Sequence, residues 1–233
     1  MIVSVNQPAY LPWLGYFQRI AVSDVHVVLD HVQFEKNSFV NRNQVLCGGQ
    51  PTWLTVPVRT KGKFGDLPIA DLEIDTSQDW RTKHWRTLSQ HYRKAPYFNR
   101  YEPFFSDVYT RQWTHLAHLC EHITAYCLKQ LGIATPLLFS RDMHLQRHKS
   151  ELVLEVCTKL HADTYLSGAL GRNYLAVEQF SRAGVKVCYQ DYRHPVYPQL
   201  GKVFHSHMAV VDLLFNCGDA SLAIMTERQE ISV

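Results

Sequence analysis

The first thirty residues constrain the fold more than any other part of this chain. The stretch 3–17 combines an apolar, β-branched run with a loop containing proline and glycine and with the start of a helix, and a second apolar run follows at 24–30. Two strands joined by so short a helix must lie parallel, because a parallel pair needs a crossover connection. The pattern therefore predicts an α/β protein with a mostly parallel sheet.

Such sheets bind ligands at the carboxyl ends of their strands, where the loops gather. Asn6, Gln7 and Tyr10 follow the first predicted strand and are candidate substrate contacts. We take Asn6 and Tyr10 as candidate catalytic residues. Gly15 removes a side chain where a backbone N–H can approach a phosphate, so we expect it to line the same site.

Composition limits the classes of function. With 233 residues and 46% hydrophobic content, the chain can bury a core without disulfides or metals, and we expect one domain over 1–233. A net charge of +3 is too small to indicate a nucleic-acid groove. There is no pattern of a signal peptide or membrane-spanning helix, and the six cysteines show no CxxC spacing. We therefore expect reduced thiols, a cytoplasmic location and no membrane insertion.

A polar, amide-rich segment over 33–43 is a further candidate site. Lys36, Asn41 and Arg42 combine cations with an amide, a mixture that suits phosphate oxygens and sugar hydroxyls. Arg42 is the preferred phosphate anchor, because a guanidinium grips two oxygens at once. A surface loop rich in Asx turns is the alternative interpretation.

Residues 80–131 show helical periodicity and predict a helical insertion. His115, His118 and His122 recur there at intervals of three and four. That spacing is compatible with metal ligands, but the HExxH-type partner is missing, so we assign no metal. The sequence does not identify a cofactor.

A second junction of a strand with a glycine-containing loop lies near Gly168. Ser167, Gly168 and Arg172 would cradle a phosphate or carboxylate, and a tight turn with a helix-capping serine is the alternative. His194, in a loop fixed by prolines, is the candidate general base, because an unshifted imidazole titrates near neutrality. Asp212 lies among apolar residues, and we expect it to anchor a loop rather than to act in catalysis.

Five blocks of the sequence closely resemble the WbqC-like family, namely 6–17, 30–43, 53–58, 165–168 and 211–218. The resemblance runs over essentially the whole chain. It implies a bacterial protein encoded among genes for O-antigen and other surface polysaccharides, and it carries over no settled reaction. Many members have histidine where this chain has Asn6, so the resemblance implies no acid or base at that position.

The block 13–16 also falls where nucleotidylyltransferases of the pantothenate-synthetase and cytidylyltransferase type carry a His-x-Gly-His motif. The glycine is kept, and Trp13 and Tyr16 stand in place of the histidines. In those enzymes imidazoles stabilise charge on the α-phosphate, which Trp13 cannot do. The resemblance therefore implies a Rossmann-like, nucleotidylyltransferase-like fold with different chemistry.

Three functions remain open on the sequence. The leading one is a cytoplasmic transferase that modifies a nucleotide-activated sugar, including amino sugars, for surface polysaccharide. The second is a nucleotidylyl or adenylate-forming transferase with the same architecture. The third is a non-catalytic binding or scaffold protein of glycan assembly. The expected partner is a small phosphorylated or nucleotide-linked molecule, and no nucleic acid is expected.

Overall fold

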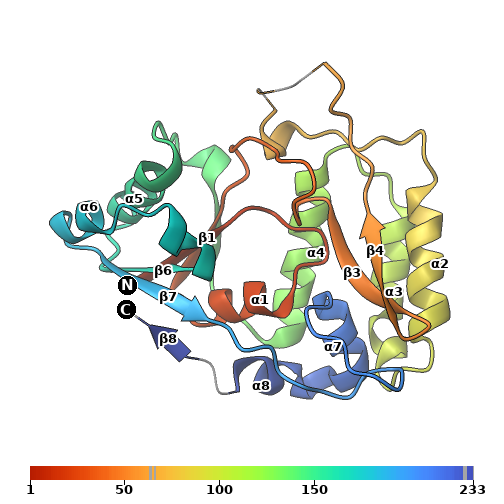
Figure 1. Ribbon diagram of the computed structural model, residues 1–233. Coiled ribbons are helices and arrows are strands. Elements are labelled where there is room, and N and C mark those ends of the chain that lie inside the picture. The colour runs from red at the N-terminus through yellow and green to blue at the C-terminus, as the bar shows by residue number, and fades with distance from the viewer. Residues whose placement is uncertain (63–64, 66, 228–229, 233) are drawn as a thin grey trace.

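The computed structural model describes residues 1–62, 65, 67–227 and 230–232, and its main feature is a mostly parallel sheet (Figure 1). Within the described residues the strand order is β5-β2-β1-β6-β7-β8. The bounds are β1 Ile2–Asn6, β2 Val25–Val28, β5 Leu137–Phe139, β6 Thr164–Ser167, β7 Lys186–Asp191 and β8 Glu230–Ser232. Strands β1, β2, β5, β6 and β7 run parallel, and β8 is antiparallel to β7.

This order confirms the expected α/β, Rossmann-like class. The chain starts in the middle of the sheet, moves outward through β2 to β5, and returns to place β6 on the other side of β1. Val3 lies between Val25 of β2 and Tyr165 of β6 in the register. A strand with parallel neighbours on both sides is buried on both faces, which explains why Val3 and Val5 are apolar and why Ser4 between them is buried as well.

Different helices cover the two faces of the sheet. Val3, Val5 and Val27 belong to one hydrophobic cluster with side chains of α5 (Lys149–Lys159) and α6 (Val177–Arg182). The other face meets α1 (Leu14–Ala21), whose Tyr16 ring packs edge-on against His26 at 5.7 Å between centroids. Buried polar groups lie on this second face, where Ser4 Oγ is 2.7 Å from His26 Nδ1.

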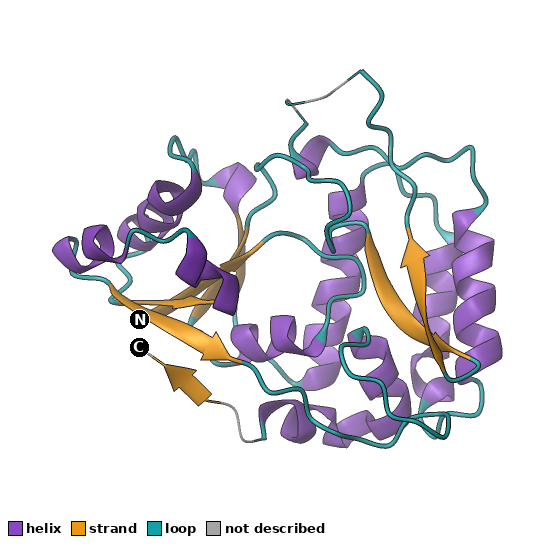
Figure 2. Ribbon diagram, in the orientation of Figure 1, coloured by secondary structure: helices purple, strands orange, loops and turns teal. Residues whose placement is uncertain are grey.

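The connection from β2 to β5 forms a second packed region (Figure 2). It contains an antiparallel hairpin and then three helices, which lie within the range 80–131 where the periodicity predicts them. Their bounds are β3 Arg42–Cys47, β4 Gln50–Thr55, α2 Trp80–Tyr92, α3 Phe98–Thr110 and α4 Leu116–Leu131. Helix α7 (Val210–Cys217) returns from late in the chain and joins the same hydrophobic cluster, and α8 (Ser221–Thr226) follows it.

Asp212 of α7 ties these segments together from a fully buried position. Its carboxylate accepts hydrogen bonds from Tyr92 Oη at 2.8 Å, Tyr197 Oη at 2.8 Å and Gln199 Nε2 at 2.7 Å. Burial raises the pKa of Asp212, and the three donors oppose that effect by stabilising the charged form. The anchoring role expected for this residue is confirmed.

No helix of the described part is long and apolar enough to cross a membrane.

Two buried histidines predict that acid weakens the fold. Burial lowers the pKa of His26 to about 3 and that of His84 to about 4, from an ordinary value of 6.5. Both are therefore neutral in the folded state, and the unfolded chain takes up protons first as the pH falls below 6.5. We expect the free energy of unfolding to drop by about 1.4 kcal/mol per histidine for each pH unit below 6.5, until the folded-state pKa is reached.

Urea unfolding at several pH values measures this slope. His84→Gln keeps a polar side chain near Tyr10 and removes one titrating group. The slope of its unfolding free energy against pH should therefore be smaller than that of the unmodified chain by the contribution of about one proton. Equal slopes for the two proteins would contradict the assignment.

Candidate functional site

The carboxyl ends of β1 and β6 meet at the point where the strand order changes direction. β1 leads outward to β2 on one side, whereas β6 leads outward to β7 on the other. Ser4 pairs with Leu166 in the parallel register, so Asn6 and Gly168 leave the sheet side by side. Ligands of doubly wound sheets bind at such a switch point. The structure thus brings together two of the residues that the sequence singles out.

Arg19 of α1 occupies this junction. Its Nε donates to Gln190 Oε1 at 3.0 Å, and its Nη1 donates to Asn6 Oδ1 at 2.5 Å. A Cβ atom added to Gly168 would lie 3.0 Å from the Arg19 guanidinium carbon and closer still to Nη2. Gly168 is therefore needed because any side chain there would displace the arginine.

None of the described carboxylates pairs with Arg19. Its hydrogen bonds go to neutral amide oxygens, and burial lowers its pKa from the usual 12.5. A cation taken out of water without a counter-ion carries an uncompensated desolvation cost. The arrangement is suited to an anionic ligand, which would supply the missing charge.

Arg19 is a site residue that the sequence analysis missed. A usable signal exists, because Arg19 is the one charged residue in the helix 14–21, which is otherwise apolar or neutral. Its position one turn after Gly15 places it beside the carboxyl end of β1 rather than in solvent.

The loop after β6 is a tight turn with an exposed arginine. Ser167 is buried, and its Oγ donates to Gly168 O at 3.1 Å and lies under Gly171, where a Cβ atom would clash with it. Arg172 of η3 (Ala169–Asn173) is exposed and stacks over the Tyr189 ring at 4.0 Å. Ser167 thus shapes the turn, whereas Arg172 is placed at the surface of the same loop.

The loop after β1 contributes less to this junction than expected. Tyr10 is fully buried, with its Oη 2.8 Å from His84 Nδ1 and 2.5 Å from Tyr109 Oη, so it is a core residue. Gly15 is buried too, and a Cβ atom there would lie 3.0 Å from the Tyr192 ring. That glycine allows an aromatic ring to pack closely, not a phosphate to approach. Gln7 is partly exposed just beyond β1.

The residues predicted from the segment 33–43 lie apart from this junction, in the loop before the hairpin and at the start of β3. Lys36 is exposed. Asn41 is buried and donates from Nδ2 to Val56 O at 2.9 Å. Arg42 lies over the Trp53 ring at 4.5 Å and donates from Nη2 to Asn37 O at 2.6 Å. Asn41 and Arg42 therefore have structural partners of their own on the hairpin.

A hydrogen-bonded relay lies at the carboxyl ends of β2 and β5. Asp30 is fully buried and pairs with Arg141 Nη1 at 2.5 Å, and its Oδ1 accepts from Ser140 Oγ at 3.0 Å. His31 Nδ1 is 2.5 Å from the same Ser140 Oγ. The single proton of the Ser140 hydroxyl lies between two acceptors, Asp30 Oδ1 and His31 Nδ1. When the hydroxyl donates to Asp30, His31 Nδ1–H donates to Ser140 Oγ and the lone pair of the imidazole is on Nε2.

This relay is a second feature that the sequence analysis missed. His31 is partly exposed, and burial is the main cause that lowers its pKa, while Asp30 and Glu155 oppose the shift and His148 adds to it. Leu29 N donates to Asn6 O at 2.7 Å. His31 therefore lies two residues along the chain from a residue that is hydrogen-bonded to the switch point. A neutral imidazole whose other nitrogen is held by a hydrogen bond suits a general base.

His194 has a different environment. Its Nδ1 lies 2.9 Å from Pro195 O, its Nε2 is buried without a partner, and its ring packs near Tyr192 and His207. Burial lowers its pKa, and His207 contributes in the same direction. The candidate base chosen from the sequence therefore lies in a cluster of rings, and no hydrogen bond joins it to Arg19 among the described residues.

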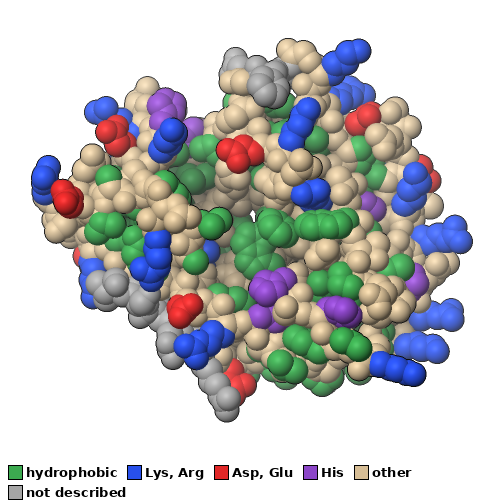
Figure 3. Space-filling model, in the orientation of Figure 1, with side chains coloured by type: hydrophobic (Ala, Val, Ile, Leu, Met, Phe, Trp, Pro, Cys, Tyr) green, Lys and Arg blue, Asp and Glu red, His purple; other side chains and the backbone are tan. Residues whose placement is uncertain are grey.

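Within the described residues there is no group of three or more histidine, cysteine, aspartate or glutamate side chains that could hold a metal ion. The cavity beside Asp30, which Pro8 and Arg141 also line, measures about 10 Å³ and has room for about one water molecule. This cavity is too small for a nucleotide or a sugar. Figure 3 shows this face, with a hollow near its middle bordered by hydrophobic side chains.

Comparison with known proteins places the chain in a family. The family model described as WbqC-like protein family matches residues 7–224. The uncharacterized protein Rv1507c of Mycobacterium tuberculosis is 34% identical over 218 residues, which cover 93% of this chain and 94% of the relative. No solved structure matches the chain. With a match over nearly its whole length, the chain belongs to the WbqC-like protein family.

Proposed function

We propose that this protein is a cytoplasmic transferase that binds a nucleotide-activated sugar at the carboxyl edge of its sheet and modifies the sugar for surface polysaccharide. The observation that carries the proposal is the Arg19 guanidinium, which is partly buried at the switch point and has no carboxylate partner in the part of the chain that the structure describes. A phosphate group provides the charge and the acceptor oxygens that this guanidinium lacks. The likeness to a family linked with surface polysaccharides supports the choice of a sugar.

The proposed roles follow from the geometry. Arg19 binds a phosphate oxygen, Gly168 leaves room for it, and Arg172 approaches the same ligand from the surface. Asn6 orients Arg19 and does not itself exchange protons. His31 accepts a proton at Nε2 from a hydroxyl or amine of the sugar, held by Ser140 and the buried Asp30 carboxylate.

The nucleotidylyltransferase alternative is less well supported. Tyr16, at one of the two histidine positions of that motif, is 1% exposed and packs against Phe17 and His26. Trp13, at the other, packs edge-on against Tyr16 and lies near Phe39. Neither side chain offers a cation to an α-phosphate.

Arg19→Gln tests phosphate binding. We expect it to weaken the binding of nucleoside diphosphate sugars by about 2 kcal/mol, roughly thirtyfold, because a charge-assisted bond is lost. Calorimetric titration against a panel of these sugars and the matching free nucleotides measures the effect. If the unmodified protein binds a nucleotide sugar and Arg19→Gln binds it equally well, the ligand lies elsewhere.

Arg141→Gln is the matched control for stability. Arg141 is exposed but pairs with the fully buried Asp30, so Arg141→Gln removes the counter-ion of a buried carboxylate and should cost about 1–3 kcal/mol. Arg19 has no such partner, so Arg19→Gln should lower the unfolding free energy much less. Urea unfolding of both variants separates a binding role from a structural one.

Gly168→Ala tests the close approach of Arg19. The added methyl group displaces the guanidinium, so ligand binding should weaken even though no ligand contact is removed. In the double variant with Arg19→Gln the two losses should not add, because both act through the same guanidinium. Additive losses would show that Gly168 acts independently.

His31→Gln tests the proton acceptor. Once a modified sugar is detected by mass spectrometry of reaction mixtures, kcat should fall by roughly a hundredfold or more, while the Kd for the nucleotide sugar changes little. His194→Gln is the matched control and should retain activity. If the unmodified protein binds nucleotide sugars and modifies none with any donor, the scaffold interpretation replaces the transferase.

A further inference from the structure

Cys47 stands apart from the other cysteines. It is the last residue of β3 and is partly exposed, whereas Cys120, Cys127, Cys157, Cys188 and Cys217 are buried, and all six thiols are free. It precedes the turn Gly48–Gly49, where both glycines have positive φ. Because glycine has no side chain, the two residues that follow Cys47 place no side chains beside it.

His91 of α2 holds this sulfur. His91 Nε2 is 2.8 Å from Cys47 Sγ, and the Gly48 N–H donates to His91 Nδ1 at 3.1 Å. Because Nδ1 accepts that bond, the proton of the neutral imidazole must be on Nε2. Nε2–H therefore donates to sulfur, which places a hydrogen-bond donor beside the atom that reacts in thiol–disulfide exchange.

A pocket of about 420 Å³ lies beside the pair. Both chain neighbours of Cys47 line it, together with His91, and so do Arg93 and Lys94 at the end of α2. Neither of these two cations pairs with a carboxylate among the described residues. The volume falls in the range of pockets that bind small molecules, and the unpaired charges suit an anionic one.

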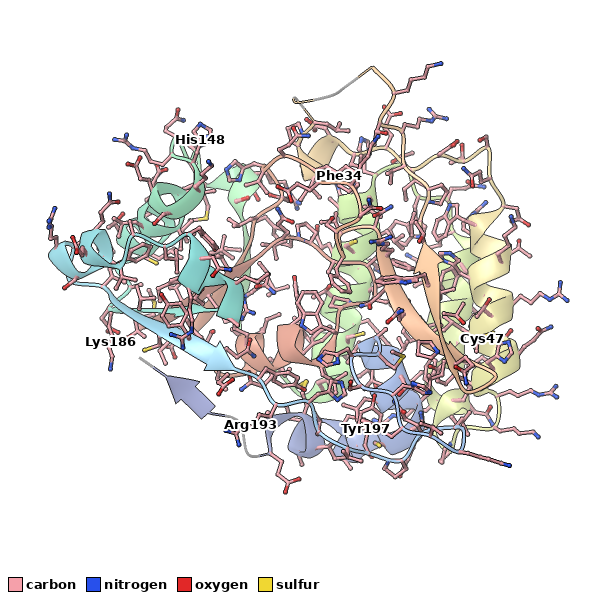
Figure 4. All side chains as sticks on the ribbon, viewed as in Figure 1. Phe34, Cys47, His148, Lys186, Arg193 and Tyr197 are labelled. Carbon is pink, nitrogen blue, oxygen red and sulfur yellow. The ribbon has the colours of Figure 1, made fainter. Side chains whose placement is uncertain are left out.

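We propose that Cys47 is a reactive thiolate that forms a mixed disulfide with an anionic low-molecular-weight thiol seated in this pocket. The Cys47 thiolate attacks one sulfur of the anionic disulfide, a new S–S bond forms as the old one breaks, and the other half leaves as a thiolate. The exchange needs no further oxidant, because the incoming disulfide is already oxidised. The site lies at the hairpin turn, away from the sheet edge (Figure 4), and does not depend on the proposed transferase function.

The experiment compares two disulfide probes on the intact native protein. Dithiobis(nitrobenzoate) is a dianionic aromatic disulfide, and dithiodipyridine is a neutral one. We expect one thiol per chain to react faster than N-acetylcysteine does at the same pH, and peptide mapping should place it at Cys47. Cys47→Ser should abolish that fast phase with both probes.

Two substitutions at one position isolate the role of the imidazole. Glutamine places its Nε2–H near the histidine Nε2, whereas asparagine replaces only the acceptor at Nδ1. His91→Asn should slow the exchange roughly tenfold at neutral pH, and His91→Gln should recover most of the rate. Circular dichroism and urea unfolding confirm that each variant is folded before its rate is measured.

Arg93→Gln combined with Lys94→Gln tests the charge of the pocket. The double variant should slow the dianionic probe several-fold at low salt and leave the neutral probe unchanged, and the difference should vanish at high salt. A fast thiol that maps to another cysteine overturns the proposal, as does a Cys47 rate equal to that of N-acetylcysteine. Equal rates for His91→Asn and His91→Gln would remove the role of His91.

Discussion

Parallel strands cannot be joined by a tight turn, and this constraint decides where the rest of the molecule lies. β1 pairs with β2 on one side and with β6 on the other, and each partner is reached by a connection that returns across a face of the sheet. All five parallel strands then end at one edge. Asn6, His31 and Gly168 are distant in sequence and meet at this edge because of the topology alone.

Two arginines at that edge have opposite electrostatic surroundings. Arg141 contacts the carboxylates of Asp30 and Glu121, at 2.5 Å and 3.1 Å, and its charge is satisfied within the protein. Among the described residues, the Arg19 guanidinium donates hydrogen bonds to two amide oxygens and pairs with no carboxylate. A fold under no functional demand would gain stability by replacing such a cation or by adding a carboxylate beside it. The contrast between them is therefore stronger evidence for a ligand than the burial of Arg19 alone.

Much of the fold follows from local sequence patterns, and much of the site does not. Burial leaves a local pattern in the sequence. It is visible in the apolar runs at β1, β2, β6 and β7 and in the helical periodicity over 80–131. The anchoring role of Asp212 was predictable for the same reason, because a carboxylate in an apolar helix must find donors. Tyr10 was misplaced as a substrate contact because its partners, His84 and Tyr109, come from helices that no local pattern links to it.

The same limit explains why the relay was missed. His31 lies just after β2 and was visible in the sequence, but Ser140, which contacts its Nδ1, lies more than a hundred residues later and arrives through β5. His194 stood next to prolines in a loop and looked accessible. Its Nε2 is in fact sealed without a partner.

Asn6 connects the two halves of the proposed site. Its contacts explain why position 6 does not need a histidine. Its side-chain oxygen accepts from Arg19, and its backbone oxygen accepts from Leu29 N, which leads to His31. An imidazole in this place would face a guanidinium that opposes its protonation. An amide accepts the same hydrogen bond at every pH. If His31 on the β2 side is the proton acceptor and Arg19 beside Gly168 is the phosphate anchor, as proposed, Asn6 between them needs only to hold Arg19 in position, and asparagine does so without a charge of its own.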